Sequence, residues 1–256
     1  MEDLKFEVPK DYLSANSPFF CEGIGTMKSP TLRTIFDGKT DNLQTYYFAK
    51  TLVGDCRDDV VKMLSMLSDK AEPSKNSSVF EEIIKTETRQ NLFAKVLSLF
   101  FENRIGYESS VGAFILLPAD ELKNDVLEGY VTKDTFNLYI SIIGQLLHDT
   151  KSLPEKQEDL SGKPPEVLKA LEAFKKYENK EKSDSSKDYT LQNIISKMCV
   201  VGSGYNLLNI YDLSIWQLLD QFQAYTQNRI SRITERSFSI WGGDSFDFGM
   251  WLKNNN

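Results

Sequence analysis

Residues 201–256 read VGSGYNLLNIYDLSIWQLLDQFQAYTQNRISRITERSFSIWGGDSFDFGMWLKNNN, and this stretch decides most of the fold that we expect. Apolar residues recur from position 215 at the spacing of an α-helix, and Asp212 or Ser214 can cap that helix at its start. All 3 tryptophans of the 256 residues lie at or after position 216. The stretch therefore predicts one amphipathic helix followed by a Trp-rich closing segment.

Helical periodicity also recurs through the rest of the chain. It predicts helices over 41–67 with a break near Gly54, over 79–103, after a cap at Thr132, and over 190–201. A shorter helix is expected to begin with Ser29 as its cap and Pro30 at its first position, and to end at Gly38.

Strand signals are fewer. The prolines within residues 1–22 favour an extended arm or short strands there. The apolar run VGAFILL at 111–117 favours a buried strand, although a buried helix has the same signal. We therefore expect a mainly α fold, a helical protein with a few short strands in its N-terminal half.

Composition changes between residues 151 and 188, where Lys, Asp and Glu dominate and Pro154, Pro164 and Pro165 occur. Such a stretch is typical of a charged linker or excursion, and it can form one helix over 166–182. It would separate an N-terminal, mainly helical domain (1–150) from a C-terminal helical segment with the Trp-rich closure (189–256), which we expect to pack on the first domain.

Overall composition narrows the class of protein. Hydrophobic residues make up 41% and charged residues 26%, which is typical of a globular chain. The net charge of -7 disfavours a nucleic-acid partner, because phosphates repel an acidic surface. No apolar run approaches the roughly 20 residues of a membrane span, and the first residues lack the features of a signal peptide. We expect a cytoplasmic protein with no membrane span.

The sequence contains few residue patterns that are typical of catalysis or of metal or phosphate binding. His148 is the single histidine, which disfavours most nucleophile–base pairs and every multi-histidine metal site. We interpret it as a helix-end residue. Cys21, Cys56 and Cys199 lack metal-site spacing and are expected to be reduced thiols, and Gly202-Ser203-Gly204 is expected to end a helix rather than bind phosphate. We expect no enzyme activity, cofactor, metal or small-molecule substrate.

The C-terminal aromatic residues are the candidate functional residues. They either complete the core of the C-terminal helix or stay exposed and anchor a partner, as aromatic side chains often do. The candidate partner-binding residues are Trp216, Phe222, Tyr225, Trp241, Phe246, Phe248 and Trp251.

Three segments carry a resemblance to known proteins: CEGIGTMKSPTLRTIFDG at 21–38, NLLNIYDLSIWQLLDQFQAY at 206–225 and SIWGGDSFDFGMWLKNN at 239–255. Together they resemble a group of sparsely described proteins encoded in the tail-morphogenesis region of phages that infect Gram-positive bacteria. The resemblance implies a non-enzymatic tail or baseplate protein that binds other tail or baseplate proteins, or further copies of itself as a homo-oligomer. It would act in the host cytoplasm during assembly and could stay in the virion tail.

Other functions are compatible with the same residues. The main alternative is a non-virion tail assembly chaperone that holds the tape-measure protein in a groove. An enzyme or small-molecule binding domain is disfavoured by the missing motifs. An inhibitor of a host defence that mimics nucleic acid is disfavoured because the net charge is too mild for that role.

Overall fold

The computed structural model describes residues 6–38, 40–54, 57–67, 77–120, 126–149, 190–201 and 204–241. Within these ranges it contains nine α-helices, one 3-10 helix and five strands. The α-helices are α1 (Lys10–Ala15), α2 (Leu32–Ile35), α3 (Asn42–Val53), α4 (Arg57–Ser65), α5 (Val79–Ile83), α6 (Glu87–Phe100), α7 (Phe136–Leu146), α9 (Leu191–Val200) and α10 (Ile215–Trp241), and the 3-10 helix is η3 (Ile210–Asp212). The strands are β1 (Phe19–Cys21), β2 (Gly25–Met27), β3 (Arg104–Glu108), β4 (Ala113–Leu117) and β5 (Gly129–Val131).

The expectation of a mainly α fold is wrong, because the described residues form a mixed α/β structure. β1 pairs antiparallel with β2, and β3, β4 and β5 form an antiparallel sheet in that order. In the sequence RIGYE of β3 the apolar Ile105 and Tyr107 alternate with charged residues and a Gly, and the register of the strand is set by pairing with β4, from Arg104 opposite Leu117 to Glu108 opposite Ala113. Pairing between strands is a long-range effect that local periodicity does not report.

Helix boundaries depend on capping side chains. The break near Gly54 is confirmed, with α3 ending at Val53. The predicted single helix over 79–103 is two helices, because Thr86 caps a new one, α6, with its hydroxyl accepting from the Arg89 N–H. α7 begins at Phe136 after Thr135, later than a cap at Thr132 would place it.

The start of α2 also differs from the prediction. Thr31, and not Ser29, caps this helix. The segment before it is extended because it pairs with the chain ahead of α10: Pro30 O accepts from Ile215 N–H at 2.9 Å, and Leu32 N–H donates to Leu213 O at 2.9 Å. Ser29 is buried there and donates to Leu146 O at 3.0 Å.

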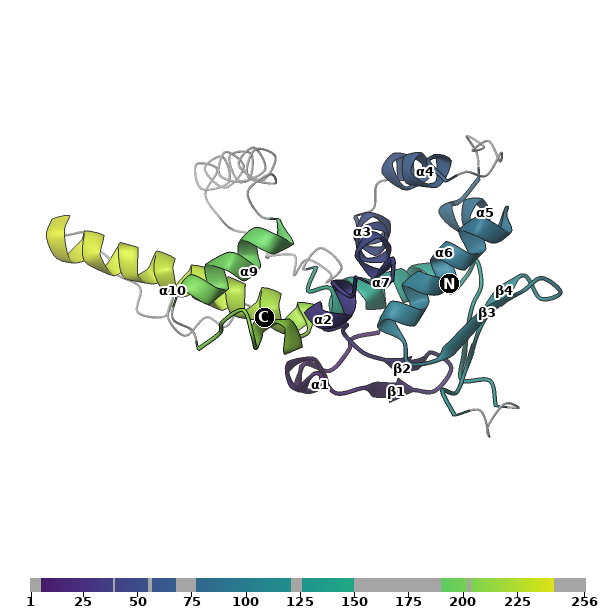
Figure 1. Cartoon of the computed structure of the whole chain (residues 1–256), viewed down its shortest axis with the longest axis horizontal. Helices are drawn as coiled ribbons and strands as arrows, with labels where there is room; N and C mark the ends of the chain where they lie inside the picture. Colours follow the sequence, from purple (N-terminus) through teal and green to yellow (C-terminus); the bar gives the residue numbers. More distant parts are fainter. Residues whose placement is uncertain are drawn as a thin grey trace, which may run out of the picture.

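The core lies between α6, α7 and one face of the β3–β4–β5 sheet (Figure 1). Aromatic rings fill it: the Phe93 centroid lies 4.9 Å from that of Phe114 and 5.6 Å from that of Phe136. Phe80 reaches Phe136 from α5, with ring centroids 5.6 Å apart. Burial of such rings is the main stabilising contribution of this layer.

The C-terminal helices join this body through the start of α10. Ser214 caps α10, since its hydroxyl accepts from Gln217 N–H at 3.1 Å while the Gln217 side chain accepts from Ser214 N–H at 2.9 Å. Asp212 instead pairs with Arg33 of α2 at 2.7 Å. From this docked start α10 runs out of the body, away from α4 and α5 (Figure 1). All of the predicted linker 151–188 and the closing segment after Trp241 lie outside the described residues.

None of the helices within the described ranges has the length and hydrophobicity that a membrane span requires.

Candidate docking groove and C-terminal surface

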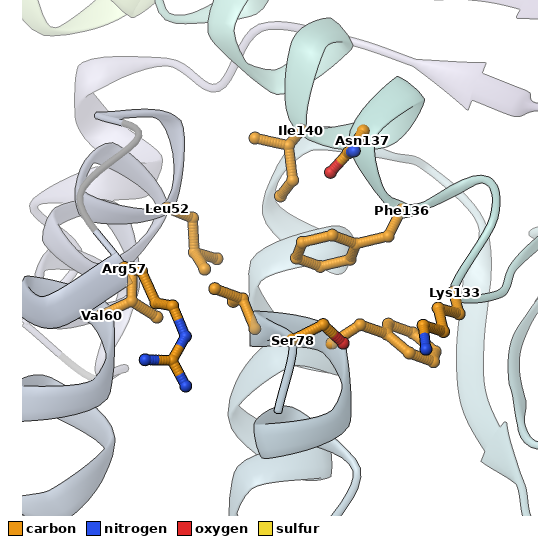
Figure 2. Close-up of a pocket in the computed structure, with 10 residues that line it drawn as sticks. Leu52, Arg57, Val60, Ser78, Lys133, Phe136, Asn137 and Ile140 are labelled. Atoms are coloured by element: carbon orange, nitrogen blue, oxygen red, sulfur yellow. The ribbon is translucent and has the colours of Figure 1, made fainter. Parts of the chain in front are cut away.

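A groove of about 330 Å³ lies where α4, α5 and α7 approach one another (Figure 2). Helices α3 and α4 form one wall, and α7 with the turn before it forms the other. The lining residues are Leu52, Arg57, Val60, Ser78, Val79, Phe80, Lys133, Phe136, Asn137 and Ile140. The volume is at the lower end of binding cavities, so the groove suits one or two side chains of a larger partner.

The groove is apolar at its centre and cationic at its sides. Arg57 and Lys133 lie on opposite sides of it, and the ring of Phe136 projects into the space between them (Figure 2). Asn137 adds an amide at the α7 wall. Both cations are engaged by neighbouring groups, Arg57 by Ser77 O and Lys133 by Glu81.

Lys133 is held in place by Glu81. Its Nζ donates to Glu81 Oε1 at 2.7 Å, which joins the turn before α7 to α5. The hydrogen bond from Lys133 is the main reason that the pKa of Glu81 lies below its usual range, and the same bond raises the pKa of Lys133. The second oxygen of Glu81 accepts from Ser78 N–H at 2.8 Å, completing a capping box on α5.

Arg57 is positioned by the chain just ahead of α5. Its Nε and Nη2 both donate to Ser77 O, at 3.1 and 2.8 Å. This fork joins the first residue of α4 to the segment that enters α5. The Arg57 side chain is thereby held at the wall of the groove.

A buried ionic cluster fixes α5 against α6 beside the groove. Glu82 and Arg89 are both fully buried, with Arg89 Nη1 donating to Glu82 Oε2 at 3.1 Å and to Glu82 O at 3.3 Å. Lys85 Nζ donates to Glu82 Oε1 at 2.6 Å, and the Ser77 hydroxyl donates to the same oxygen. Because a buried carboxylate needs every one of these donors, the cluster restricts how α5 and Ser77 can move.

The candidate aromatic residues of the C-terminal helix lie in different environments. Trp216 is buried by its own chain, at 9% exposure, and its backbone N–H donates to Ser29 Oγ at 3.3 Å. Phe222 and Tyr225 are half-buried against the core. Trp241 is the last residue of α10, with its side chain outside the described part of the structure. Phe246, Phe248 and Trp251 also lie outside the described residues, and the partner-binding role of the seven stays a prediction.

His148 lies directly after α7, at a helix end as predicted. Its φ of 55° is left-handed, while its N–H donates to Gln145 O at 3.1 Å and Asp149 N–H donates to Gly144 O at 2.9 Å. This is the Schellman ending of a helix, a position that favours glycine. The imidazole packs on Trp216 with ring centroids 5.2 Å apart, which gives the histidine a packing role there.

A second surface lies at the end of α9 and on the loop between α9 and α10, and it was not predicted from the sequence. Val200, Leu207 and Leu208 are 83%, 66% and 85% exposed. The side chain of Asn206 accepts from the backbone N–H of Leu208 at 2.8 Å, and the side chain of Asn209 accepts from Asn206 N–H at 2.8 Å. The Asn-Leu-Leu-Asn spacing is the signal that could have revealed this loop, since paired Asn side chains stabilise tight turns.

Within the described residues, no group of three or more His, Cys, Asp or Glu side chains is arranged to hold a metal ion.

The C-terminal part of the chain is similar to a known family. Residues 172–256 match the model of the YomV second domain, a phage-related family. The match includes α9, α10 and the exposed loop between them, and it is consistent with a phage protein. No curated protein and no solved structure matches the chain.

Proposed function

We propose that this chain is a non-enzymatic bacteriophage tail or baseplate protein that acts in virion tail assembly by binding other tail or baseplate proteins. The observation that carries the proposal is the loop that presents Leu207 and Leu208 to solvent. The similarity to a phage-related family, which spans this loop, supports the phage context.

The physical argument rests on exposed apolar surface that is already ordered. Leu208 at 85% exposure leaves nearly its whole side chain in water, and its removal from water in a complex is favourable. Asn206 and Asn209 make hydrogen bonds to the backbone of this loop, which favour its folded conformation before a partner binds. Because little conformational freedom is then lost on binding, such a loop is suited to anchor a partner.

The test is binding of the purified chain to the individually expressed tail and baseplate proteins of the phage that encodes it. The Leu207→Ser/Leu208→Ser double variant is expected to weaken the complex about tenfold or more. Val111→Ser is the matched control, since Val111 is 68% exposed but lies on the turn between β3 and β4. Equal binding by all three proteins, or no binding partner among the tail proteins, would contradict the proposal.

A non-virion chaperone for the tape-measure protein is the alternative role for the same contacts. The groove between α4, α5 and α7 favours it, because a groove of this size accepts one or two anchor side chains of an amphipathic helix. Mass spectrometry of purified particles separates the two roles. A tail or baseplate component is present in the finished particle, whereas a chaperone is found only in the host cytoplasm during assembly.

A further inference from the structure

We propose that the edge strand β3 pairs with β3 of a second copy of this chain, so that two copies share one continuous antiparallel sheet. The two strands would run antiparallel, with Gly106 of one copy opposite Gly106 of the other. This inference concerns the purified chain alone, and it holds or fails independently of the proposed role in virion tail assembly.

The β3–β4–β5 sheet has one covered edge and one open edge. The turn between β1 and β2 lies along β5, since Gly23 forms a bridge with Gly129. On the other side of β3, the described part of the chain contains no neighbouring strand. Within that part, no backbone hydrogen bond joins Ile105, Gly106 or Tyr107 to a segment other than β4. An edge of this kind presents N–H and C=O groups to which a further strand can be added.

The outer face of β3 is open at its centre. Because side chains alternate along a strand, Arg104, Gly106 and Glu108 share the outer face. Tyr107 faces the core instead, with its ring centroid 5.0 Å from that of Phe114. Gly106 is exposed, and a Cβ added to it would meet no atom within 4 Å. The ribbon of β3 and β4 extends beyond α5 and α6, where a second copy can approach it (Figure 1).

The sequence RIGYE is complementary to itself when two copies run antiparallel. With the two Gly106 residues opposite each other, Arg104 of each copy lies opposite Glu108 of the other. On the inner face, Ile105 lies opposite Tyr107 in the same way. Opposite charges, and a β-branched side chain opposite an aromatic one, are favourable cross-strand pairs. Each of these pairs occurs twice in the dimer, and this complementarity is why we assign the edge to a second copy.

The charges also favour this register over its neighbours. A shift by two residues in one direction would place Glu108 opposite Glu102 of the second copy, where like charges repel. The opposite shift would place Arg104 opposite Ser110, in the turn after β3. Both shifts lose the two pairs between Arg104 and Glu108, so the register centred on Gly106 should be the most stable one.

The two charged side chains also have contacts within their own chain. Arg104 Nε donates to Pro118 O at 3.0 Å. Glu108 Oε1 accepts from the Ser110 hydroxyl at 2.7 Å and from its N–H at 3.1 Å, and these bonds hold the pKa of Glu108 below its usual range. Both groups therefore stay charged near neutral pH. The attraction between them acts through space and does not require that these bonds break.

The pairing of a strand with its own copy has a defined consequence for assembly. The contact is isologous, because the same five residues are used on both sides. Each copy has one β3, which is fully used in the pair. Association should therefore stop at a dimer with two-fold symmetry rather than continue into a ring or a filament.

The test uses charge reversal in the full-length chain, followed by sedimentation equilibrium. The original chain is expected to form a dimer. Arg104→Glu and Glu108→Arg should each weaken that dimer by about tenfold or more, because like charges then face each other twice. A mixture of these two variants should form a 1:1 heterodimer, since every acidic side chain then faces a basic one. The double variant Arg104→Glu/Glu108→Arg should dimerise like the original chain.

A second pair of variants leaves the contact between Arg104 and Pro118 O unchanged. Gly106→Lys and Gly106→Glu each place like charges opposite each other at the centre of the dimer, so each variant alone should be monomeric. Their mixture should form a heterodimer. Gly38→Lys is the matched control, because Gly38 is also exposed and an added Cβ would meet no atom within 4 Å, but it lies between α2 and α3. This control should dimerise like the original chain, and urea unfolding verifies that every variant is folded.

Four results would overturn the inference. The first is an original chain that stays monomeric up to its solubility limit. The second is a folded Arg104→Glu or Gly106→Lys variant that dimerises as well as the original chain. The third is a mixture of the two Gly106 variants that remains monomeric. The fourth is a dimer that is lost in Leu207→Ser/Leu208→Ser but kept in the Gly106 variants, because the contact would then lie at the loop between α9 and α10.

Discussion

Replacement of Arg89 by Met should destabilise the protein strongly, because it leaves a buried carboxylate without its main partner. Arg89 and Glu82 are both fully buried. In the variant, Glu82 Oε2 loses the N–H that lies 3.1 Å away, and Glu82 O loses a second one at 3.3 Å. Met fills much of the volume of the aliphatic part of the Arg89 side chain, so the substitution mainly removes charge and hydrogen bonds.

The expected magnitude follows from the burial of the pair. Breaking a buried ion pair by removal of one partner typically costs about 3–5 kcal/mol. Lys85 remains within 2.6 Å of Glu82 Oε1 and is partly exposed, which places the cost near the lower end of that range. A total stability of about 5–15 kcal/mol is usual for a domain, so the variant would lose a large fraction of it.

Urea unfolding followed by fluorescence measures this loss in a double-mutant cycle. The second variant is Glu82→Leu/Arg89→Met, which removes both charges and replaces them by apolar side chains. It should be more stable than Arg89→Met alone, since no unpaired carboxylate stays buried. Lys95→Met is the control for a surface cation, with an expected change below about 1 kcal/mol because exposed ion pairs contribute little.

Two results would refute this reasoning. The first is an Arg89→Met variant that loses less than about 1 kcal/mol, as a surface pair would. The second is a double variant whose loss equals the sum of the two single losses, because that would show that the two groups do not interact.

Three further predictions concern the fold. Gly129→Ala should cost about 1–3 kcal/mol in urea unfolding, because the added Cβ would lie 2.6 Å from Ile24 O, while Gly106→Ala, with open space, should change little. Ser214→Ala should cost about 1 kcal/mol through loss of the α10 cap, again by urea unfolding. Burial raises the pKa of Tyr139 above the value of about 10 that a tyrosine has in the unfolded chain. The stabilisation that comes from the neutral Tyr139 side chain should therefore be fully present below a pH of about 10 and be lost as the pH rises further. Tyr139→Phe should reduce that slope in alkaline unfolding.

The sequence predicted those elements whose signals are local. The apolar period and the Thr190 cap define α9 within its own residues, and the break at Gly54 is likewise visible along the chain. The strand β4 was predicted because its five residues are almost entirely apolar. β3 was missed although Ile105 and Tyr107 alternate in it, since two apolar residues around a Gly are a short signal and the ladder with β4 forms only after the chain has folded back.

The candidate surfaces divide in the same way. The chemistry of the closing segment, with its alternating Asp and Phe, is visible in the sequence. The groove is not visible in the sequence, because Arg57 is positioned by Ser77 O and Lys133 by Glu81, and each of these partners lies in another part of the chain. Local periodicity carries no information about such long-range contacts.

The sequence by itself determined that an amphipathic helix begins near residue 215, because apolar spacing and a cap at Asp212 or Ser214 act within a few residues; the structure assigns the cap to Ser214 and the end of the helix to Trp241. Only the tertiary structure decided where the start of that helix packs. Trp216, expected as a partner-binding residue, is buried there against His148, because Pro30 and Ser29 draw the start of α10 onto the body. Leu207 and Leu208 remain in solvent instead, since two asparagine side chains hold their loop outward.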